Sequence, residues 1–185
     1  MGGSASRTDD GPRTDDAGDA TFPRPPCAFT DGDGRTIGIC RLAADDRSAL
    51  AEFYDAFGPA GRAQGLPPRT MAAIESWLAD IRDEGVNAVA RHDDRLVGHA
   101  CLVPARDARH ELAIFVGNDY RQAGIGRRLL RRLLGVGEAR DVERVWLVVQ
   151  PHNTAARRLY ESAGFERTGG PAGPNATDIE MERRL

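Results

Sequence analysis

The sequence predicts an α/β (α+β) protein in which helices flank a mixed, mostly antiparallel sheet of six to seven strands. Short apolar runs typical of strands alternate with longer segments whose apolar residues follow the helical period. Residues 87–116 contain strand-like runs joined by short turns, which is the pattern of an antiparallel meander. A further apolar run at 145–149 follows a helical segment, so we expect it to lie parallel to the strand before that helix.

The chain is expected to consist of a tail and one domain. Residues 1–30 are rich in Gly, Ser, Asp, Thr and Pro, which predicts a disordered acidic tail. Burial of so few large apolar side chains cannot offset the entropy of ordering this segment. The aspartate pairs fit a solvated tail better than a docking peptide. Residues 31–185 form the single predicted domain, with order beginning near Arg35.

The first half of the domain is predicted to supply core helices. A strand at 36–42 precedes a helix that ends before Gly58, and a second amphipathic helix spans 71–81. The apolar residues of both helices are interpreted as core rather than as ligand contacts. The loop at 58–69 is rich in Gly, Arg and Pro, so we expect acceptor recognition there.

The second half is predicted to alternate strands with helices. In chain order, the elements are strands at 87–91, 96–103 and 110–116, a helix at 124–139, a strand at 145–149, a helix after Asn153 and a strand at 177–183. The glycine-rich segment at 169–175 is interpreted as a mobile rim of the acceptor site.

The most informative stretch joins a strand, a glycine turn and a helix between Ala113 and Leu134. Gly124 and Gly126 carry no Cβ, so the backbone can pass close to a ligand. A helix that begins there directs unpaired N–H groups outward, and such an end attracts phosphate. The spacing Arg121-x-x-Gly124-x-Gly126 fits neither the dinucleotide fingerprint nor the nucleotide P-loop. A glycine turn that merely connects the strand to the helix is the alternative interpretation.

A second informative stretch runs from Gln150 to Phe165. Asn153 is a natural N-cap of a helix, and Gly164 is a natural stop at its end. Between them, apolar residues share one buried face of the helix. Tyr160 is the exception, because core packing alone would be served equally well by Phe.

Composition argues against several classes of function. The net charge of −3 gives no footprint for nucleic acid, and all 25 cationic residues are Arg. The cysteines, Cys27, Cys40 and Cys101, lack the spacing of a disulfide framework or a zinc site. No apolar run approaches the roughly 18 residues of a membrane span, and the N-terminus lacks the apolar region of a signal peptide. We therefore expect a cytoplasmic protein without a metal, as a monomer or a homodimer.

Together, the two stretches resemble the GNAT superfamily of acyl-CoA-dependent N-acyltransferases. The first is similar to its signature R/Q-x-x-G-x-G/A, and the second to its pattern N-x-x-A-x-x-L-Y-x-x-x-G-F. The resemblance covers about Arg35 to the C-terminus and implies the GNAT fold, with acetyl-CoA as co-substrate. In this family the loop amides hold the pyrophosphate, and the preceding strand pairs with the pantetheine arm. The implied coenzyme contacts are Ile114, Phe115, Val116, Arg121, Gln122, Ala123, Gly124, Ile125, Gly126, Arg127, Asn153 and Tyr160.

Within the superfamily, residues 110–116 resemble the segment A-E-x-A-x-x-V of bacterial and archaeal protein lysine acetyltransferases, apart from the first residue. The resemblance implies that Glu111 is the general base. Members that acetylate protein N-termini place a Glu on the next strand, where this chain has Val148. A protein lysine is therefore the expected acceptor. A small-molecule amine and a CoA-binding regulatory module without catalysis are the alternatives.

The expected chemistry is direct attack of the amine in a ternary complex. An alkylamine of pKa about 10.4 must lose a proton first, at a cost of about 4 to 5 kcal/mol near neutral pH. Glu111 is the predicted base. His110 as base, substrate-assisted deprotonation and an exposed Glu111 without a role stay open. Tyr160 is the predicted acid, because a tyrosine of pKa about 10 still holds a proton that it can donate to the leaving thiolate, whose pKa is near 8.5. A packing role and a hydrogen bond to the coenzyme sulfur without proton transfer are the alternatives.

Overall fold

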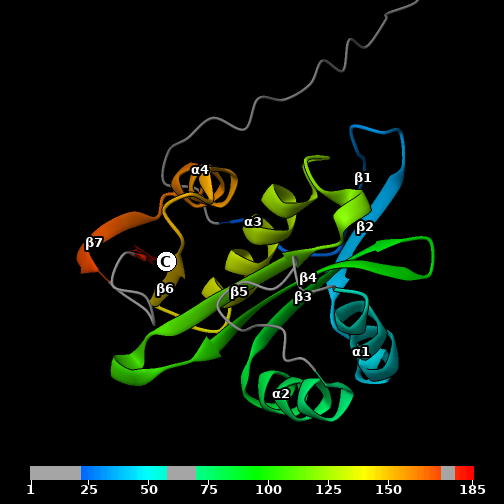
Figure 1. The fold of residues 1–185 in the computed structure, drawn as a ribbon, viewed down its shortest axis with the longest axis horizontal. Coiled ribbons are helices and arrows are strands. Elements are labelled where there is room, and N and C mark those ends of the chain that lie inside the picture. Colours follow the sequence, from blue (N-terminus) through cyan, green and yellow to red (C-terminus); the bar gives the residue numbers. More distant parts are fainter. Residues whose placement is uncertain (1–21, 58–69, 172–177) are drawn as a thin grey trace, which may run out of the picture.

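The computed structural model describes residues 22–57, 70–171 and 178–185. Within these ranges the chain forms one eight-stranded sheet with the strand order β1-β2-β3-β4-β5-β6-β8-β7. Helices cover both faces of the sheet (Figure 1). The expected acceptor loop at 58–69 and residues 172–175 of the expected rim lie outside the described residues.

Neighbouring strands are antiparallel except for β5 and β6, which are parallel. The strands are β1 (Cys27–Thr30), β2 (Thr36–Arg41), β3 (Val86–His92), β4 (Arg95–Pro104), β5 (His110–Val116), β6 (Arg144–Val149), β7 (Glu166–Pro171) and β8 (Ile179–Arg184). The predicted mixed, mostly antiparallel sheet and its parallel crossover are confirmed, with eight strands in place of six to seven.

The sequence does not predict β1 or β7. β1 is short and follows a proline-rich stretch, and β7 contains both glycine and proline. Residues 27–30 pair with β2, and Phe22 is only 5% exposed. The backbone N–H of Phe22 also donates to the Glu138 carboxylate at 2.8 Å. The prediction of a disordered tail is therefore wrong for residues 22–30, while residues 1–21 lie outside the described ranges.

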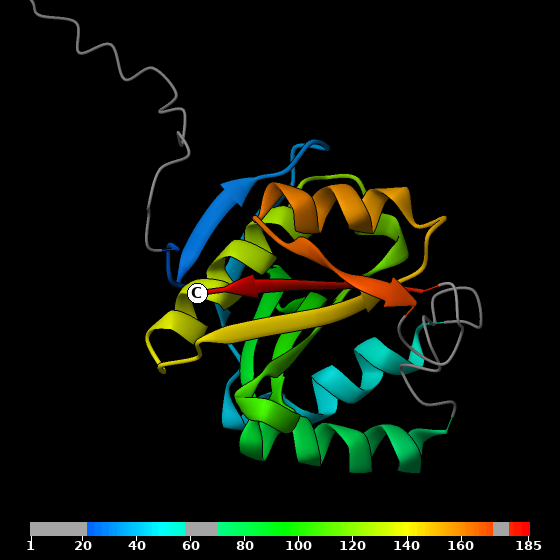
Figure 2. The ribbon, with the colours of Figure 1, turned by 90° about the vertical axis from the view of Figure 1, so that its left-hand side faces the viewer.

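The α-helices pack in pairs on the two faces of the sheet. They are α1 (Arg47–Asp55), α2 (Met71–Glu84), α3 (Ile125–Glu138) and α4 (Thr154–Ser162). Figures 1 and 2 show α1 and α2 on one face and α3 and α4 on the other. The helical spacing of the apolar residues in α3 explains its packing, because its leucines 129, 130, 133 and 134 are fully buried.

An aromatic cluster lies between the sheet and the pair α1 and α2. We call it the aromatic wall, and it consists of Tyr54, Phe57, Trp77 and Phe115. The ring of Tyr54 meets Phe115 edge to face at 5.2 Å between centroids, and meets Trp77 in the same way at 5.0 Å. This geometry is the one aromatic pairs prefer, so the wall holds its rings in fixed orientations.

A buried chain of hydrogen bonds supports the aromatic wall. The hydroxyl of Tyr54 lies 2.5 Å from Nδ1 of His99, and Nε2 of His99 lies 2.9 Å from Oδ1 of Asn87. The amide nitrogen of Asn87 donates to the carbonyls of Ile81 and Gly85, so its oxygen accepts from His99. We therefore assign the imidazole proton to Nε2 and the donor role at Nδ1 to Tyr54. Burial lowers the pKa of His99 to about 3, which keeps the ring neutral.

The strands β5 and β6 pair only where β5 begins. His110 pairs with Val145 and Glu111 with Trp146, and the remainder of β5 has no partner in β6. The two parallel strands therefore separate after Glu111. Beyond Glu111, this separation leaves one backbone edge of β5 without a strand partner among the described residues, and it opens the middle of the sheet. On this edge, the carbonyl of Val116 accepts a hydrogen bond from Nε of Arg121 at 3.5 Å.

Candidate active site

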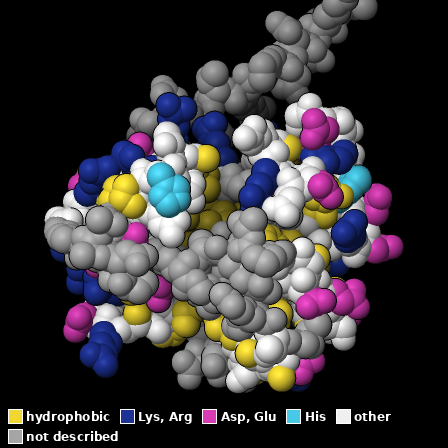
Figure 3. All heavy atoms as spheres, in the orientation of Figure 1, with side chains coloured by type: hydrophobic (Ala, Val, Ile, Leu, Met, Phe, Trp, Pro, Cys, Tyr) yellow, Lys and Arg dark blue, Asp and Glu magenta, His cyan; other side chains and the backbone are white. Residues whose placement is uncertain are grey.

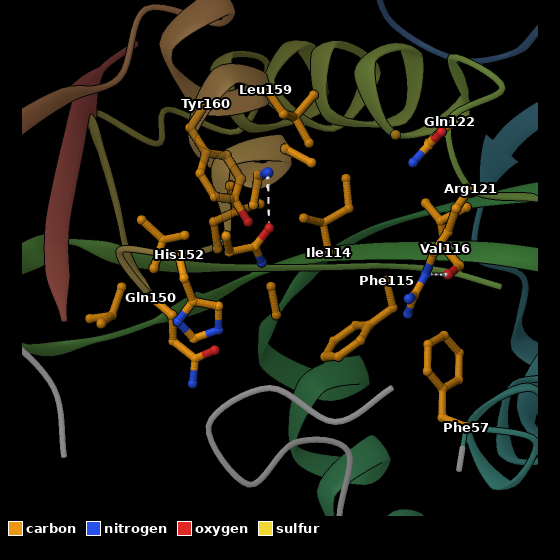
Figure 4. A pocket seen from close by; sticks show the side chains of 18 of the residues that line it. Phe57, Ile114, Phe115, Val116, Arg121, Gln122, Gln150, His152, Leu159 and Tyr160 are labelled. Carbon is orange, nitrogen blue, oxygen red and sulfur yellow. Dashed lines mark hydrogen bonds between the residues drawn. The ribbon is translucent and has the colours of Figure 1, made fainter. Parts of the chain in front are cut away.

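A cleft of about 670 Å³ lies where β5 and β6 separate. Its walls come from β5, the loop before α3, the end of β6 and the first turns of α4 (Figure 4). Figure 3 shows apolar side chains in a hollow near the centre of this face. Of the predicted site residues, Glu111, Ile114, Phe115, Val116, Arg121, Gln122, Gly126, Asn153 and Tyr160 line the cleft.

The glycine loop, which we define as residues 121–127, forms one end of the cleft. Gly124 caps α3 with a φ of +80°, and Gln122 has a φ of +61°, so the chain turns sharply into the helix. Among the described residues, no acceptor meets the backbone N–H groups of residues 122–127. Unpaired N–H groups at the positive end of a helix are the kind of arrangement to which phosphate groups commonly bind in proteins.

Not every predicted loop contact reaches the cleft with its side chain. Ala123 and Ile125 are buried in the hydrophobic core, so only their backbone is available to a ligand. Gly124 and Arg127 do not line the cleft. A Cβ built on Gly126 would lie 3.7 Å from the side chains of Leu159 and Val116. The protein alone would accept that atom, but it would occupy space in the cleft.

β5 forms the long wall of the cleft. Its register with β4 is continuous from Pro104–His110 to Gly98–Val116, so the strand contains no bulge. Alternation therefore places Glu111 on the same face as Phe115, and His110 on the other face. The unpaired edge of β5 offers backbone donors and acceptors to an extended ligand, as the predicted pairing with a pantetheine arm requires.

Glu111 stands where β5 and β6 separate. Among the described residues it is the one Asp or Glu that lines the cleft. Partial burial disfavours its charged form and raises the pKa of the carboxyl group. The neighbouring His110 does not line the cleft, its Nδ1 is buried without a partner among the described residues, and burial lowers its pKa. The geometry therefore favours Glu111 over His110 as the predicted base.

Tyr160 lies on α4, across the cleft from β5. Its ring contacts Phe165 at 5.9 Å between centroids, and the residue is 9% exposed. Figure 4 shows its hydroxyl end directed into the cleft. Burial raises the pKa of Tyr160 to about 12, so the hydroxyl keeps its proton at neutral pH. Burial also raises the pKa of Cys101 to about 12, but unlike Tyr160 this thiol does not line the cleft.

Asn153 begins α4 as the sequence predicts. Its Oδ1 accepts a hydrogen bond from the backbone N–H of Ala156 at 3.1 Å, which confirms the N-cap. The cap uses the oxygen and leaves the amide nitrogen available at the edge of the cleft. Its predicted contact with the pantetheine arm stays a prediction.

Several lining residues are absent from the predicted set. Tyr120 directly precedes Arg121, and Gln150 and His152 lie within three residues before Asn153, so position beside a motif is the signal that could identify them. Phe57 lines the cleft too, yet its apolar helical spacing indicates core alone. Phe57 is therefore both a core residue and a cleft residue, because its ring also packs against that of Phe115, with 5.9 Å between centroids.

Comparison with known families decides what this fold is. The model of the acetyltransferase (GNAT) family matches residues 47–165, which include both informative stretches, the cleft strands and the glycine loop. The chain belongs to this family. The predicted superfamily and fold are therefore confirmed, whereas the expected lysine-acetylating branch is not decided by the match.

Curated relatives of this GNAT protein include enzymes named for acetylating protein N-termini. It is 40% identical over 91 residues to the ribosomal protein bS18 alanine N-acetyltransferase of Salmonella typhimurium, covering 49% of the chain and 62% of the relative. It is 39% identical over 130 residues to N-alpha-acetyltransferase 40 of Saccharomyces cerevisiae, covering 57% and 45% respectively. The chain thus spans about half to three-fifths of the length of these relatives.

Solved GNAT structures share the fold over most of the chain. The GNAT domain of S. lividans PAT superposes with a TM-score of 0.71 at 17% identity, over 86% of this chain and 97% of that one. A ribosomal-protein-alanine N-acetyltransferase from Brucella melitensis gives 0.67 at 25% identity, over 80% and 99%. A phosphinothricin acetyltransferase from Sinorhizobium meliloti, solved with acetyl-CoA, gives 0.67 at 21% identity, over 85% and 89%. Among the described residues, no helix is long and apolar enough to span a bilayer.

Proposed function

We propose that this GNAT protein transfers an acetyl group from acetyl-CoA to a primary amine of a protein, with a lysine side chain as the acceptor. The observation that carries the proposal is the placement of Glu111. It is the one carboxylate among the described residues that lines the cleft, and it stands where the strands separate. Among the described residues, Glu111 is therefore the one carboxylate that an amine in this cleft would meet.

The residues of the cleft fit acetyl-CoA. Free N–H groups at the start of α3 would hold the diphosphate, and the unpaired edge of β5 would pair with the amides of the pantetheine arm. Ile114, Val116 and Leu159 supply apolar contacts along the same path. Bound acetyl-CoA supplies an activated carbonyl group and a thiolate leaving group.

Glu111 is proposed to take the proton of the acceptor ammonium, directly or through a water molecule. Partial burial makes this carboxylate a stronger base than a solvated Glu, because the pKa is raised. A lysine needs such help, since its free base costs about 4 to 5 kcal/mol near neutral pH.

Tyr160 is proposed to give a proton to the departing thiolate. Its pKa of about 12 keeps the hydroxyl protonated throughout the neutral range. The hydroxyl lies on the α4 side of the cleft, and Glu111 lies on the strand opposite. Glu111 would take a proton from the acceptor amine, and Tyr160 would give a proton to the thiolate. The amine can therefore attack directly, without an acyl-enzyme.

The α-amino group of a protein N-terminus is the second candidate acceptor. The names of the relatives favour it, because they describe acetylation of a ribosomal protein alanine and of N-alpha groups. With a pKa of about 7.7 to 8.0, an α-amine costs about 1 kcal/mol to deprotonate at neutral pH. Val148 argues for the lysine acceptor, since the resemblance to the superfamily implies a Glu at this place in members that acetylate protein N-termini.

Two peptides of matched sequence test the acceptor. One carries a blocked N-terminus and one free lysine, and the other a free N-terminus with Arg in place of that lysine. We expect thiol release with acetyl-CoA, and a mass increase of one acetyl group, for the lysine peptide. Acetylation of the second peptide alone would overturn the lysine assignment. Turnover of small amines alone would exclude a protein acceptor, and coenzyme binding with no turnover would indicate a binding module.

A further inference from the structure

We propose that Arg35, in the turn between β1 and β2, is a positioning residue that holds the glycine loop in its coenzyme-binding shape. The inference rests on the proposed function, because it concerns the same coenzyme site. Arg35 precedes residues 47–165, the part matched by the family model, and it does not line the cleft. Its contacts with the residues around the loop therefore call for a separate explanation.

The turn that carries Arg35 is held rigid by one carboxylate. The side chain of Asp31 is fully buried and accepts hydrogen bonds from the backbone N–H groups of Asp33 and Arg35, at 3.0 and 2.9 Å. Its second oxygen pairs with Nε of Arg35 at 2.7 Å. Nη2 of Arg35 bonds Asp33 at 2.8 Å. Contacts within its own turn thus hold the guanidinium group of Arg35 in a fixed orientation.

Arg35 then contacts two successive residues that lead into the glycine loop. Nη1 donates to the backbone carbonyl of Asp119 at 2.9 Å, and the guanidinium lies 4.3 Å from the centroid of the Tyr120 ring. Both belong to the 3₁₀ turn Asn118–Tyr120, and Tyr120 lines the cleft directly before Arg121. A planar guanidinium can lie flat on the ring and donate in its own plane at the same time, a geometry that a tetrahedral ammonium group does not reproduce.

Other contacts also hold the chain around Arg121 in place. The hydroxyl of Tyr120 lies 2.9 Å from Nδ1 of His92, so the ring is held from β3 as well. On the far side of Arg121, a Cβ at Gly32 would lie 4.0 Å from the Cα of Ala123. The hairpin turn therefore contacts the chain before Arg121 and lies close to it after Arg121.

The glycine loop needs such support because part of its backbone is strained. Gln122 has a φ of +61°, a conformation that costs a residue with a side chain about 1 kcal/mol or more. Strain of this kind persists where the surroundings fix the conformation. Without Arg35, the turn Asn118–Tyr120 loses a hydrogen bond and its stacking partner, and the N–H groups of residues 122–127 would no longer converge on one anion.

Two substitutions at Arg35 and one control test the role. We expect Arg35→Ala to raise both the KM and the calorimetric Kd for acetyl-CoA about tenfold, while kcat stays within about twofold. Arg35→Lys keeps the charge and loses the stacked fork, so it should shift the same two constants by a smaller factor. Arg41→Ala changes an exposed arginine at the other end of β2 and should leave both constants unchanged.

Hydrogen exchange separates a positioning role from a general structural one. Peptides that span residues 118–127 should exchange faster in Arg35→Ala than in the wild type, and not in Arg41→Ala. An unchanged Kd and KM in a folded Arg35→Ala protein would overturn the proposal, as would a loss of kcat alone. Wild-type protein that binds acetyl-CoA without turning over would contradict the proposed function, yet the Kd comparison would still decide the role of Arg35. Wild-type protein that does not bind acetyl-CoA would overturn both.

Discussion

The two sides of the cleft differ in what they offer a ligand. On the α3 side, the glycine loop offers backbone N–H groups, and Gly126 leaves room because it has no side chain. On the side of α1 and α2, the aromatic wall offers rings that a buried hydrogen-bond chain holds in place through Tyr54 and His99. One side of the cleft thus presents backbone groups, and the other side is formed by side chains.

This difference separates local from long-range requirements. The glycine loop is made by one continuous segment, so its geometry depends on a few residues in fixed spacing and on support from outside. The aromatic wall combines α1, α2 and β5, and its hydrogen-bond chain adds β3 and β4. We therefore expect added side-chain volume in the glycine loop to weaken coenzyme binding. In the aromatic wall, we expect the loss of a buried hydrogen-bond partner to lower the stability of the protein.

Glu111→Gln should give the largest effect, since it removes the proposed base on the wall side of β5. We expect kcat/KM for a lysine peptide to fall about a hundredfold to ten-thousandfold near neutral pH. Binding of acetyl-CoA should stay the same, because the glycine loop is untouched. Steady-state kinetics and calorimetry on the same preparation check both parts, with the exposed Glu143→Gln as a control.

The pH dependence sharpens the assignment of Glu111. In the wild type, kcat/KM should fall as pH drops through the pKa of this carboxyl, which burial raises above the usual value near 4.5. Gln cannot titrate, so the variant should lack that limb and follow the fraction of free amine, rising tenfold per pH unit toward the amine's pKa. Identical pH profiles for the two proteins would show that Glu111 is not the base.

Gly126→Val should give the next largest effect, and on coenzyme affinity instead of chemistry. The first added carbon meets Leu159 and Val116 at ordinary contact distance, so the protein should fold with an unchanged melting temperature. The rest of the side chain would occupy the cleft, and we expect the Kd for acetyl-CoA to rise about tenfold to hundredfold. Gly38→Val, where nothing lies within 4 Å, is the matched control. Wild-type affinity in Gly126→Val would show that the loop does not hold the coenzyme.

The backbone side of the cleft could be predicted from the sequence because its determinants are local. The glycine turn that leads into α3 at Gly124 and the cap of α4 at Asn153 are both as expected, since turn and cap chemistry depends on immediate neighbours. The strand His110–Val116 has the bounds that the sequence predicts, and its alternation places Glu111 on the same face as Phe115. Local chemistry therefore specified both the motif and the strand that leads into it.

The wall side could not be predicted because its contacts join distant segments. His99 reads as one polar residue in an apolar strand, and nothing near it in sequence indicates Tyr54 or Asn87 as partners. Phe57 has the spacing of a core residue and turns out to line the cleft as well. The sequence does not predict β1 for the same reason. Cys27–Thr30 forms a strand because it pairs with β2, and its own composition does not indicate one.

The buried histidine of the wall predicts a pH-dependent stability that the loop side does not share. His99 has a pKa of about 3 in the folded protein, against about 6.5 when unfolded, so the unfolded state binds the extra proton as pH falls. Stability from this residue is complete above about pH 6.5 and falls by about 1 kcal/mol between pH 6.5 and 5.5. His99→Gln should be less stable at pH 7.5, because Tyr54 loses its acceptor, but its stability should change less over the same interval. Denaturant unfolding at pH 6.5 and pH 5.5 measures this change in the free energy of unfolding. The exposed His152→Gln is the control, and we expect its slope of stability against pH to match the wild type. Equal slopes in wild type and His99→Gln would mean that the imidazole is not held neutral by the wall, and the contrast between the two sides of the cleft would lose its physical basis.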